Sequence, residues 1–356
     1  MAPLQPDVLP ARPAQQHGIG IIGAGGIVRY GHLPAYRRAG WPVVGIASRR
    51  EEAVRAVQQE WEIPVGVTEW RALLDLPAVE VVDVAYPFDE ERLEIVREAA
   101  SRGKHILMQK PLAHSLEVAE EMVHLAAQHG VILAVNQNAR WCPQYRAAQW
   151  AVAQGLLGEL FSLAHVMHNN QDAQPWFHDR WYAQQPRFQI LEYAVHHLDL
   201  MRFWTAMEPT RVSATIGRKP GQLLRGEMLA SITLAFPNGA VGTLIENNAA
   251  HPGVEPTSYF RLDGVHGMVD GYAMGPVGFR LFSDRLDDAV QELTLPSSWF
   301  PDAFIGTMGE LLLAIEEHRE PSISARDNLN TLRLVFAAYA DAECVEPEVS
   351  PFSIML

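Results

Sequence analysis

The order of apolar runs in the first third of the chain constrains its fold more than any other feature. Short β-type runs alternate with amphipathic stretches of helical spacing, from the run at residues 18–22 to the run at 131–136. Such alternation is typical of βαβ units, whose strands pair in parallel, and right-handed crossovers favour a doubly wound sheet. We therefore predict an α/β first domain built on a parallel sheet.

After residue 138 the regular alternation of strand and helix patterns ends. Two helical stretches flank a polar, aromatic-rich segment, and apolar–polar alternation then recurs without intervening helices, at residues 211–217, 229–236, 240–247, 258–263 and 278–282. Consecutive strands of this kind predict an α+β domain with an open, mostly antiparallel sheet. At ~150 residues per domain, 356 residues fit two domains. We divide the chain into a flexible tail (1–16), a first domain (17–138) and a C-terminal domain (139–356).

Charge and composition exclude several classes of partner. The chain has 28 Lys+Arg against 42 Asp+Glu, a net charge of −14, which disfavours nucleic acid and anionic membrane surfaces. No apolar run approaches the ~18 residues of a membrane span, and the proline-rich start lacks the pattern of a signal peptide. Cys142 and Cys344 form no motif, so we expect a cytoplasmic protein in a reducing compartment.

A glycine-rich turn follows the first strand run and opens the first helical stretch. It reads Gly23-Ala-Gly25-Gly26-Ile27. In a βα junction, Gly23 would allow the tight turn, and Gly25 would let the backbone approach a pyrophosphate held at the helix N-terminus. The position in the first βα unit favours a dinucleotide-binding Rossmann domain over a plain structural turn.

The end of the second strand run bears on the choice of dinucleotide. In NAD-binding domains an acid at this place accepts hydrogen bonds from the ribose hydroxyls. This chain has Ser48 and Arg49 instead. Ser48 and Arg49 could bind a 2′-phosphate, which an acid would repel. The sequence therefore favours NADP, with NAD possible, although an ordinary solvated surface is the alternative reading of the arginines.

Two further groups carry candidate chemistry. Lys110 ends a strand run, at the sheet edge where ligands bind in this architecture, and Pro111 fixes the following turn. Glu192 and His196 are four residues apart on a predicted helix, so they should share a face, with Glu192 orienting His196 as a general base. The alternatives are a surface lysine, a buried structural histidine, and a metal site with Asp199 as third ligand. No second group at ligand spacing supports a metal, so we expect none.

Together these segments resemble the Gfo/Idh/MocA family of oxidoreductases (glucose–fructose oxidoreductase, inositol dehydrogenase and rhizopine catabolism proteins). The resemblance is carried by IGIIGAGGIVRYGHLPAY, GKHILMQKPLAHSLEVAEEM and ILEYAVHHLDLMRFW, with a similar ending in residues 319–343. It implies a Rossmann domain followed by an α/β domain for substrate binding and oligomerisation. It also implies hydride transfer between NAD(P) and a secondary alcohol or carbonyl of a sugar, inositol or related polyol.

The same resemblance assigns residues to roles. Lys110 matches the lysine of the family's Glu-Lys-Pro motif, with Gln109 replacing the glutamate, and His196 matches the histidine of its Asp-x-x-x-His motif. Glu192 stands where the aspartate usually stands. Three sets complete the expected site: Tyr86, Pro87 and Lys110 beside the cofactor; Arg140 and Trp141 at a family substrate position; and Trp176 and Arg180 in the aromatic segment before the catalytic helix.

Expectations about assembly and activity follow from the same likeness. The C-terminal sheet should join copies into a homodimer or homotetramer. Two other functions remain open: a non-catalytic dinucleotide-binding regulator of the same fold, and a reductase of a dihydrodiol-type or tetrapyrrole-type substrate. The joint presence of Lys110 and His196 favours an enzyme over a regulator, because a regulator requires neither.

Overall fold

A six-stranded parallel sheet forms the first domain, as the sequence predicts. The computed structural model describes residues 6, 8, 12–174, 177, 181–251, 253, 255–274, 278–295 and 299–344. The strand order is β3-β2-β1-β4-β5-β6. The strands are β1 (Ile19–Ile22), β2 (Val43–Ala47), β3 (Val65–Val67), β4 (Val81–Val84), β5 (His105–Gln109) and β6 (Leu133–Asn136). All pairs are parallel, so the confirmed fold gathers every strand's carboxyl end at one edge.

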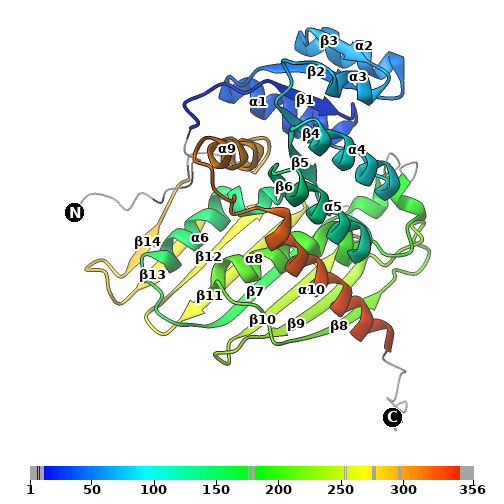
Figure 1. Cartoon of the computed structure of the whole chain (residues 1–356). Coiled ribbons are helices and arrows are strands. Elements are labelled where there is room, and N and C mark those ends of the chain that lie inside the picture. Colours follow the sequence, from blue (N-terminus) through cyan, green and yellow to red (C-terminus); the bar gives the residue numbers. More distant parts are fainter. Residues whose placement is uncertain are drawn as a thin grey trace.

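Helices connect these strands and cover both faces of the sheet (Figure 1). They are η1 (Val28–His32), α1 (Leu33–Ala39), α2 (Glu51–Trp61), α3 (Trp70–Leu74), α4 (Asp89–Ser101) and α5 (Leu116–Gln128). Local sequence explains their limits. Glu51 and Glu52 occupy the first turn of α2, where the helix dipole favours acids, and Ser115 caps α5 by accepting from the Val118 N–H at 3.2 Å.

An eight-stranded sheet forms the second domain. Its order is β14-β13-β12-β11-β7-β10-β9-β8, and every pair is antiparallel except β7 with β10. The strands are β7 (Leu160–His168), β8 (Arg211–Gly217), β9 (Leu229–Ala235), β10 (Val241–Asn247), β11 (Thr257–Gly264), β12 (Gly267–Met274), β13 (Phe279–Ser283) and β14 (Val290–Glu292). The mostly antiparallel sheet is confirmed. The sequence analysis missed β7, whose inward positions include the polar His165, and also β12 and β14.

Helices cover one face of this sheet, the one toward the first domain (Figure 1). The longer ones are α6 (Pro143–Ala153), α8 (Val195–Thr205) and α10 (Ala325–Cys344), whereas α9 (Asp302–Glu316) lies beside the first domain. The short ones are η2 (Asn138–Trp141), η3 (Gln171–Ala173), η4 (Trp181–Gln184) and η5 (Gln189–Ala194). Among the described residues no helix is both long and apolar enough to cross a bilayer.

Helix α9 packs on the first domain, although its residues follow the second sheet. Phe304, Met308 and Leu311 share a hydrophobic core with Ile19 and Ile21 of β1. The described part of the N-terminal segment also reaches this helix, because the Ala14 and Gln15 N–H groups donate to the Glu316 carboxylate at 3.0 and 2.6 Å. The two domains therefore share a packed boundary.

Arg140, expected at the substrate, is a structural residue of this boundary. Its guanidinium donates to both carboxylate oxygens of Asp199 at 2.6 and 2.8 Å, and also to Asp327 at 2.9 Å and the Ser322 carbonyl at 2.6 Å. The residue is only 6% exposed. Trp141 is equally buried and packs against α9, where a Cβ added to Gly306 would lie 2.1 Å from the indole ring. Both side chains hold elements together rather than lining an open pocket.

The hydrogen bonds of Arg140 should contribute strongly to the free energy of unfolding of the protein. Arg140→Met removes the guanidinium that binds both oxygens of the buried Asp199 carboxylate, and breaking a buried pair in this way costs about 3–5 kcal/mol. Urea unfolding measures the loss. Arg333→Met is the matched control, because Arg333 pairs with Glu120 with half of each side chain exposed, and such surface pairs contribute about 0–1 kcal/mol. Equal losses in the two variants would contradict the structural role.

Candidate functional site

The carboxyl edge of the parallel sheet brings together side chains from four predicted motifs. Gly23–Ile27 follows β1, Ser48 and Arg49 follow β2, Tyr86 and Pro87 follow β4, and Lys110 follows β5. Because the strands are parallel, these segments lie along one edge, the place where open α/β sheets bind ligands.

The glycine turn leaves an open cradle at this edge. Gly23 has φ of +128°, and a Cβ there would lie 2.5 Å from the Ala85 carbonyl oxygen, so only glycine fits. A Cβ at Gly25 would meet no heavy atom within 4 Å, and helical winding begins at Gly26. A free space beside a helix N-terminus suits the pyrophosphate of a dinucleotide.

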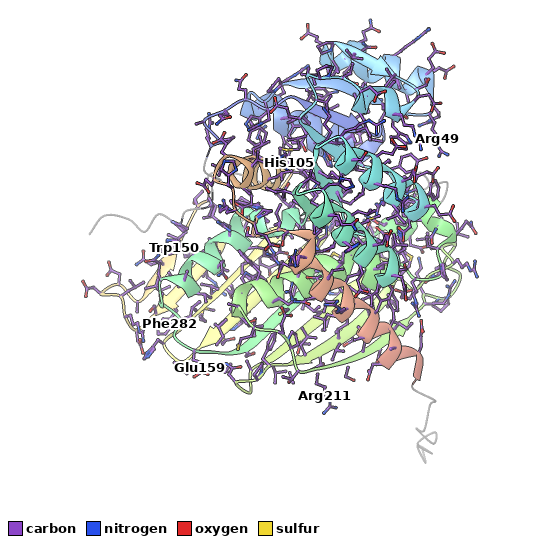
Figure 2. The ribbon with its side chains drawn as sticks, viewed as in Figure 1. Arg49, His105, Trp150, Glu159, Arg211 and Phe282 are labelled. Carbon is purple, nitrogen blue, oxygen red and sulfur yellow. The ribbon has the colours of Figure 1, made fainter. Side chains whose placement is uncertain are left out.

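Arg49 lies just after β2 at this edge, far from His105 at the opposite edge of the sheet (Figure 2). Its guanidinium carbon is 5.3 Å from the centroid of the Tyr86 ring, and its Nη1 is 3.9 Å from the Glu91 carboxylate. The side chain is 66% exposed. Burial, with the hydrogen bond to Glu91, raises the pKa of Tyr86 to about 12. This edge of the sheet therefore carries the exposed Arg49 guanidinium next to the neutral Tyr86 ring.

Lys110 is held by the second domain. Its Nζ donates to the Glu192 main-chain oxygen at 2.6 Å and lies 3.4 Å from the Glu192 Oε2. Both side chains are largely buried. Burial raises the pKa of Glu192, but Lys110, His114 and Arg92 outweigh it and lower that pKa to about 2. Glu192 is therefore an anion fixed beside the Lys110 ammonium.

The expected pairing of Glu192 with His196 is not formed. Glu192 lies in η5, which has π-helical winding, so residues four apart no longer stand directly above one another. Its carboxylate turns instead to Lys110 and to His114, whose Nε2 is 3.2 Å from Oε1. Glu192 consequently positions the lysine rather than orienting the histidine.

His196 is a buried, neutral imidazole. It is 9% exposed, and its Nδ1 has no hydrogen-bond partner among the described residues. Burial lowers the pKa of His196 well below its usual value, and the charges of Lys110 and His197 lower it further. Along the chain, His196 follows Glu192, whose main-chain oxygen accepts from Lys110 Nζ, by four residues. A neutral histidine near a lysine can accept a proton while the ammonium stabilises negative charge.

Gln109, which replaces the motif's glutamate, belongs to a buried polar network under this site. Its Oε1 accepts from the Lys110 N–H at 2.8 Å, and its Nε2 lies 3.2 Å from His32 Nε2. His32 Nδ1 in turn donates to Asp83 at 2.5 Å. This network fixes the start of the loop that carries Lys110. The carboxylate in the network is that of Asp83 in β4, because Gln109 replaces the motif's glutamate at the end of β5.

The sequence analysis missed two residues, His114 and Asp89. His114 lies between Asp89 and Glu192, with both ring nitrogens directed at carboxylate oxygens. The signal available was weak: a histidine four residues after Lys110, and an acid in the first turn of the helix that follows β4. Trp181 packs edge-on against His114, with ring centroids 5.5 Å apart. Trp176 and Arg180, predicted substrate contacts, lie outside the described residues.

The proposed metal alternative does not form, because Asp199 is bound to Arg140. Among the described residues one other group could converge on a cation: His165, His197 and Glu246. Its Glu246–His197 distance of 2.6 Å is that of a hydrogen bond and shorter than the separation of two ligands on zinc. The His165 and His197 rings stack with their centroids 3.7 Å apart, so the lone pairs in the two ring planes do not converge on a common point. This geometry describes a hydrogen-bonded network.

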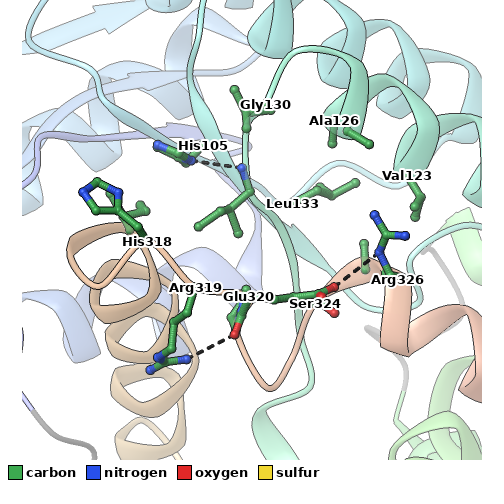
Figure 3. A pocket seen from close by; sticks show the side chains of 16 residues that line it. His105, Val123, Ala126, Gly130, Leu133, His318, Arg319, Glu320, Ser324 and Arg326 are labelled. Atoms are coloured by element: carbon green, nitrogen blue, oxygen red, sulfur yellow. Dashed lines mark hydrogen bonds and ion pairs between the residues drawn. The ribbon is translucent and has the colours of Figure 1, made fainter.

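A cavity of about 450 Å³ lies away from the site, at the amino ends of β5 and β6 (Figure 3). His105 begins β5 there, and the ends of α5, α9 and α10 complete the walls. The arginines at its rim are already paired, Arg319 with Glu310 at 2.9 Å and Arg326 with Glu320 at 3.5 Å. The cavity is therefore separate from the edge that carries Lys110.

Comparison with known proteins agrees with this geometry. Residues 17–137 match a family described as an oxidoreductase family with an NAD-binding Rossmann fold, and residues 145–270 match the GFO/IDH/MocA C-terminal domain. The chain is 28% identical to D-apiose dehydrogenase of Paraburkholderia graminis, over 90% of this chain and 86% of the relative. It is 33% identical to 1,5-anhydro-D-fructose reductase of Ensifer adhaerens, over 55% of this chain and 58% of that relative.

A solved structure shows the same fold. An oxidoreductase from Agrobacterium radiobacter, in complex with NAD⁺, L-tartaric acid and magnesium, superposes with a TM-score of 0.82 at 23% identity, covering 93% of this chain and 97% of that one. The sequence matches span both domains. The chain belongs to the GFO/IDH/MocA family of NAD(P)-dependent oxidoreductases.

Proposed function

We propose that the protein interconverts a secondary alcohol and a carbonyl of a sugar, inositol or related polyol, with NADP as the preferred dinucleotide. The proposal rests mainly on one observation: the Lys110 ammonium, from the cofactor edge, donates to the main-chain oxygen of Glu192, four residues before the buried His196 of the second domain. The activities named for the apiose and anhydrofructose relatives support a sugar-like substrate.

The chain's own residues divide the chemistry between them. A bound nicotinamide dinucleotide would supply the donor or acceptor of the hydride, with its pyrophosphate over Gly23–Ile27. His196 takes the proton of the substrate hydroxyl, which its neutral state permits at physiological pH. Lys110 stabilises the negative charge that develops on the same oxygen. Glu192 holds Lys110 in place. In the reverse direction His196 returns the proton to the carbonyl oxygen.

Assembly through the second sheet completes the proposal. The face of this sheet away from α8 carries exposed apolar side chains, among them Val241 and Ile245 of β10 and Phe282 of β13. Burial of such a face between two copies would remove apolar surface from water. We therefore expect a homodimer or homotetramer joined at this sheet.

His196→Ala and His196→Gln should lower turnover at least about a hundredfold, because general acid–base catalysis contributes about 10²–10⁴. Cofactor binding should remain unchanged, since His196 belongs to the second domain. Nicotinamide absorbance with a polyol and ketose panel measures turnover, and nucleotide fluorescence measures binding. His124→Ala, at an exposed position of α5, is the control. Unchanged turnover in both His196 variants would exclude the assigned base, and binding with no turnover in the wild type would favour the regulator.

Arg49→Ala should weaken NADPH binding by about tenfold or more, because a charge-assisted hydrogen bond contributes about 1.5–3 kcal/mol. NADH binding should change far less, since NADH lacks the 2′-phosphate. Dissociation constants for both nucleotides, measured by fluorescence titration, give the comparison. Arg55→Ala, on the exposed face of α2, is the matched control. Equal losses for NADPH and NADH would show that Arg49 does not read the 2′-phosphate.

A further inference from the structure

His114 stands at the centre of a chain of charged groups that reaches Lys110. Its Nδ1 lies 2.7 Å from Asp89 Oδ1, and its Nε2 lies 3.2 Å from Glu192 Oε1. Its own backbone N–H also donates to Asp89 Oδ2 at 2.7 Å. Asp89 comes from the start of α4 and Glu192 from η5, so the imidazole bridges the two domains.

Both ring nitrogens of His114 must carry hydrogen in this position. An ionised carboxylate only accepts hydrogen bonds, and each nitrogen faces one. A neutral imidazole would direct one lone pair at a carboxylate oxygen. Burial alone would lower the pKa of His114, but the bonds to Asp89 and Glu192 raise it above its usual value. The geometry thus holds His114 as an imidazolium.

The remaining neighbours modulate this charge without replacing it. Arg92 of α4 is buried and opposes the imidazolium, but its guanidinium is engaged by the carbonyl oxygens of Tyr86 and Pro111. Trp181 of η4 contacts the imidazole with its ring perpendicular to it. Lys110 is the other cation and lies on the far side of Glu192. The Glu192 carboxylate is therefore divided between two cations.

This division bears on how free Lys110 is to bind substrate. An ammonium has three donors, and two of those on Lys110 are directed at Glu192, one at the main-chain oxygen and one at Oε2. The longer contact, 3.4 Å, is the one to the carboxylate that His114 also binds. Among the described residues, His114 is the group that hydrogen-bonds Oε1, so without the imidazolium the carboxylate could close onto Lys110.

We propose that His114 is a positioning residue: clamped between Asp89 and Glu192, it keeps Glu192 from closing fully on Lys110 and so leaves the lysine able to bind the substrate oxygen. The inference deepens the proposed function and rests on it for its kinetic consequence. Because the clamp needs the protonated ring, activity that depends on it should be present below the His114 pKa and lost as pH rises through that pKa.

The clamp is tested without any substrate by NMR titration of the imidazole nitrogens. In the wild type, both His114 nitrogens should be protonated at neutral pH, with a pKa above the ordinary value of a histidine. Asp89→Asn removes one carboxylate and should lower this pKa by about one unit or more. His124, exposed on α5, is the internal control for the substitution. A singly protonated His114 at neutral pH, or no shift in the variant, would overturn the clamp.

The positioning role is tested by the pH dependence of kcat/KM. His114→Gln should lower kcat/KM about tenfold and remove the alkaline decline that belongs to His114. His114→Lys, which restores a permanent cation, should recover activity and extend it to higher pH. His124→Gln is the matched control and should follow the wild-type profile. Identical profiles for wild type and His114→Gln would overturn the role, whereas absence of turnover with an intact NMR titration would count against the proposed function instead.

Discussion

A buried ion pair between two domains organises the site. Lys110 reaches it from the end of β5, and Glu192 reaches it from η5, the helical segment that precedes α8. Neither partner could be removed from water alone without a large cost, so the domains must meet where the two charges meet. The same contact places the Lys110 ammonium at the edge of the sheet that holds the glycine turn. The Lys110–Glu192 contact thereby joins the cofactor edge of the first domain to the second domain.

This arrangement fixes the protonation of the groups around it. Burial and the nearby Lys110 lower the pKa of His196, so the histidine is neutral, while Lys110 and His114 keep Glu192 ionised. The structure therefore holds a neutral imidazole and an ammonium group, and the surroundings of each maintain its protonation state. The deeper network of Gln109, His32 and Asp83 anchors the loop that carries the lysine. Stability and chemistry thus depend on overlapping sets of hydrogen bonds.

The sequence predicts most of the fold and part of the site. Strand–helix alternation identifies the parallel sheet because it is periodic and local, and the glycine turn and Lys110 follow because strand ends meet at one edge. The partner of Glu192 was wrongly predicted, since π winding in η5 and attraction from Lys110 are set by tertiary contacts. Arg140 was also misplaced, because its partner Asp327 is distant in sequence. His114 carries no local pattern that reveals two carboxylates around it.

The central claim is that Lys110 and His196 together serve a hydride transfer to or from a carbon–oxygen bond. The most direct measurement uses NADPH deuterated at the transferable C4 position, incubated with a panel of keto-sugars and keto-inositols, followed by mass spectrometry of the products. The account predicts one deuterium on the carbon of a newly formed secondary alcohol. Nucleotide binding without deuterium in any product, across the whole panel, would contradict it.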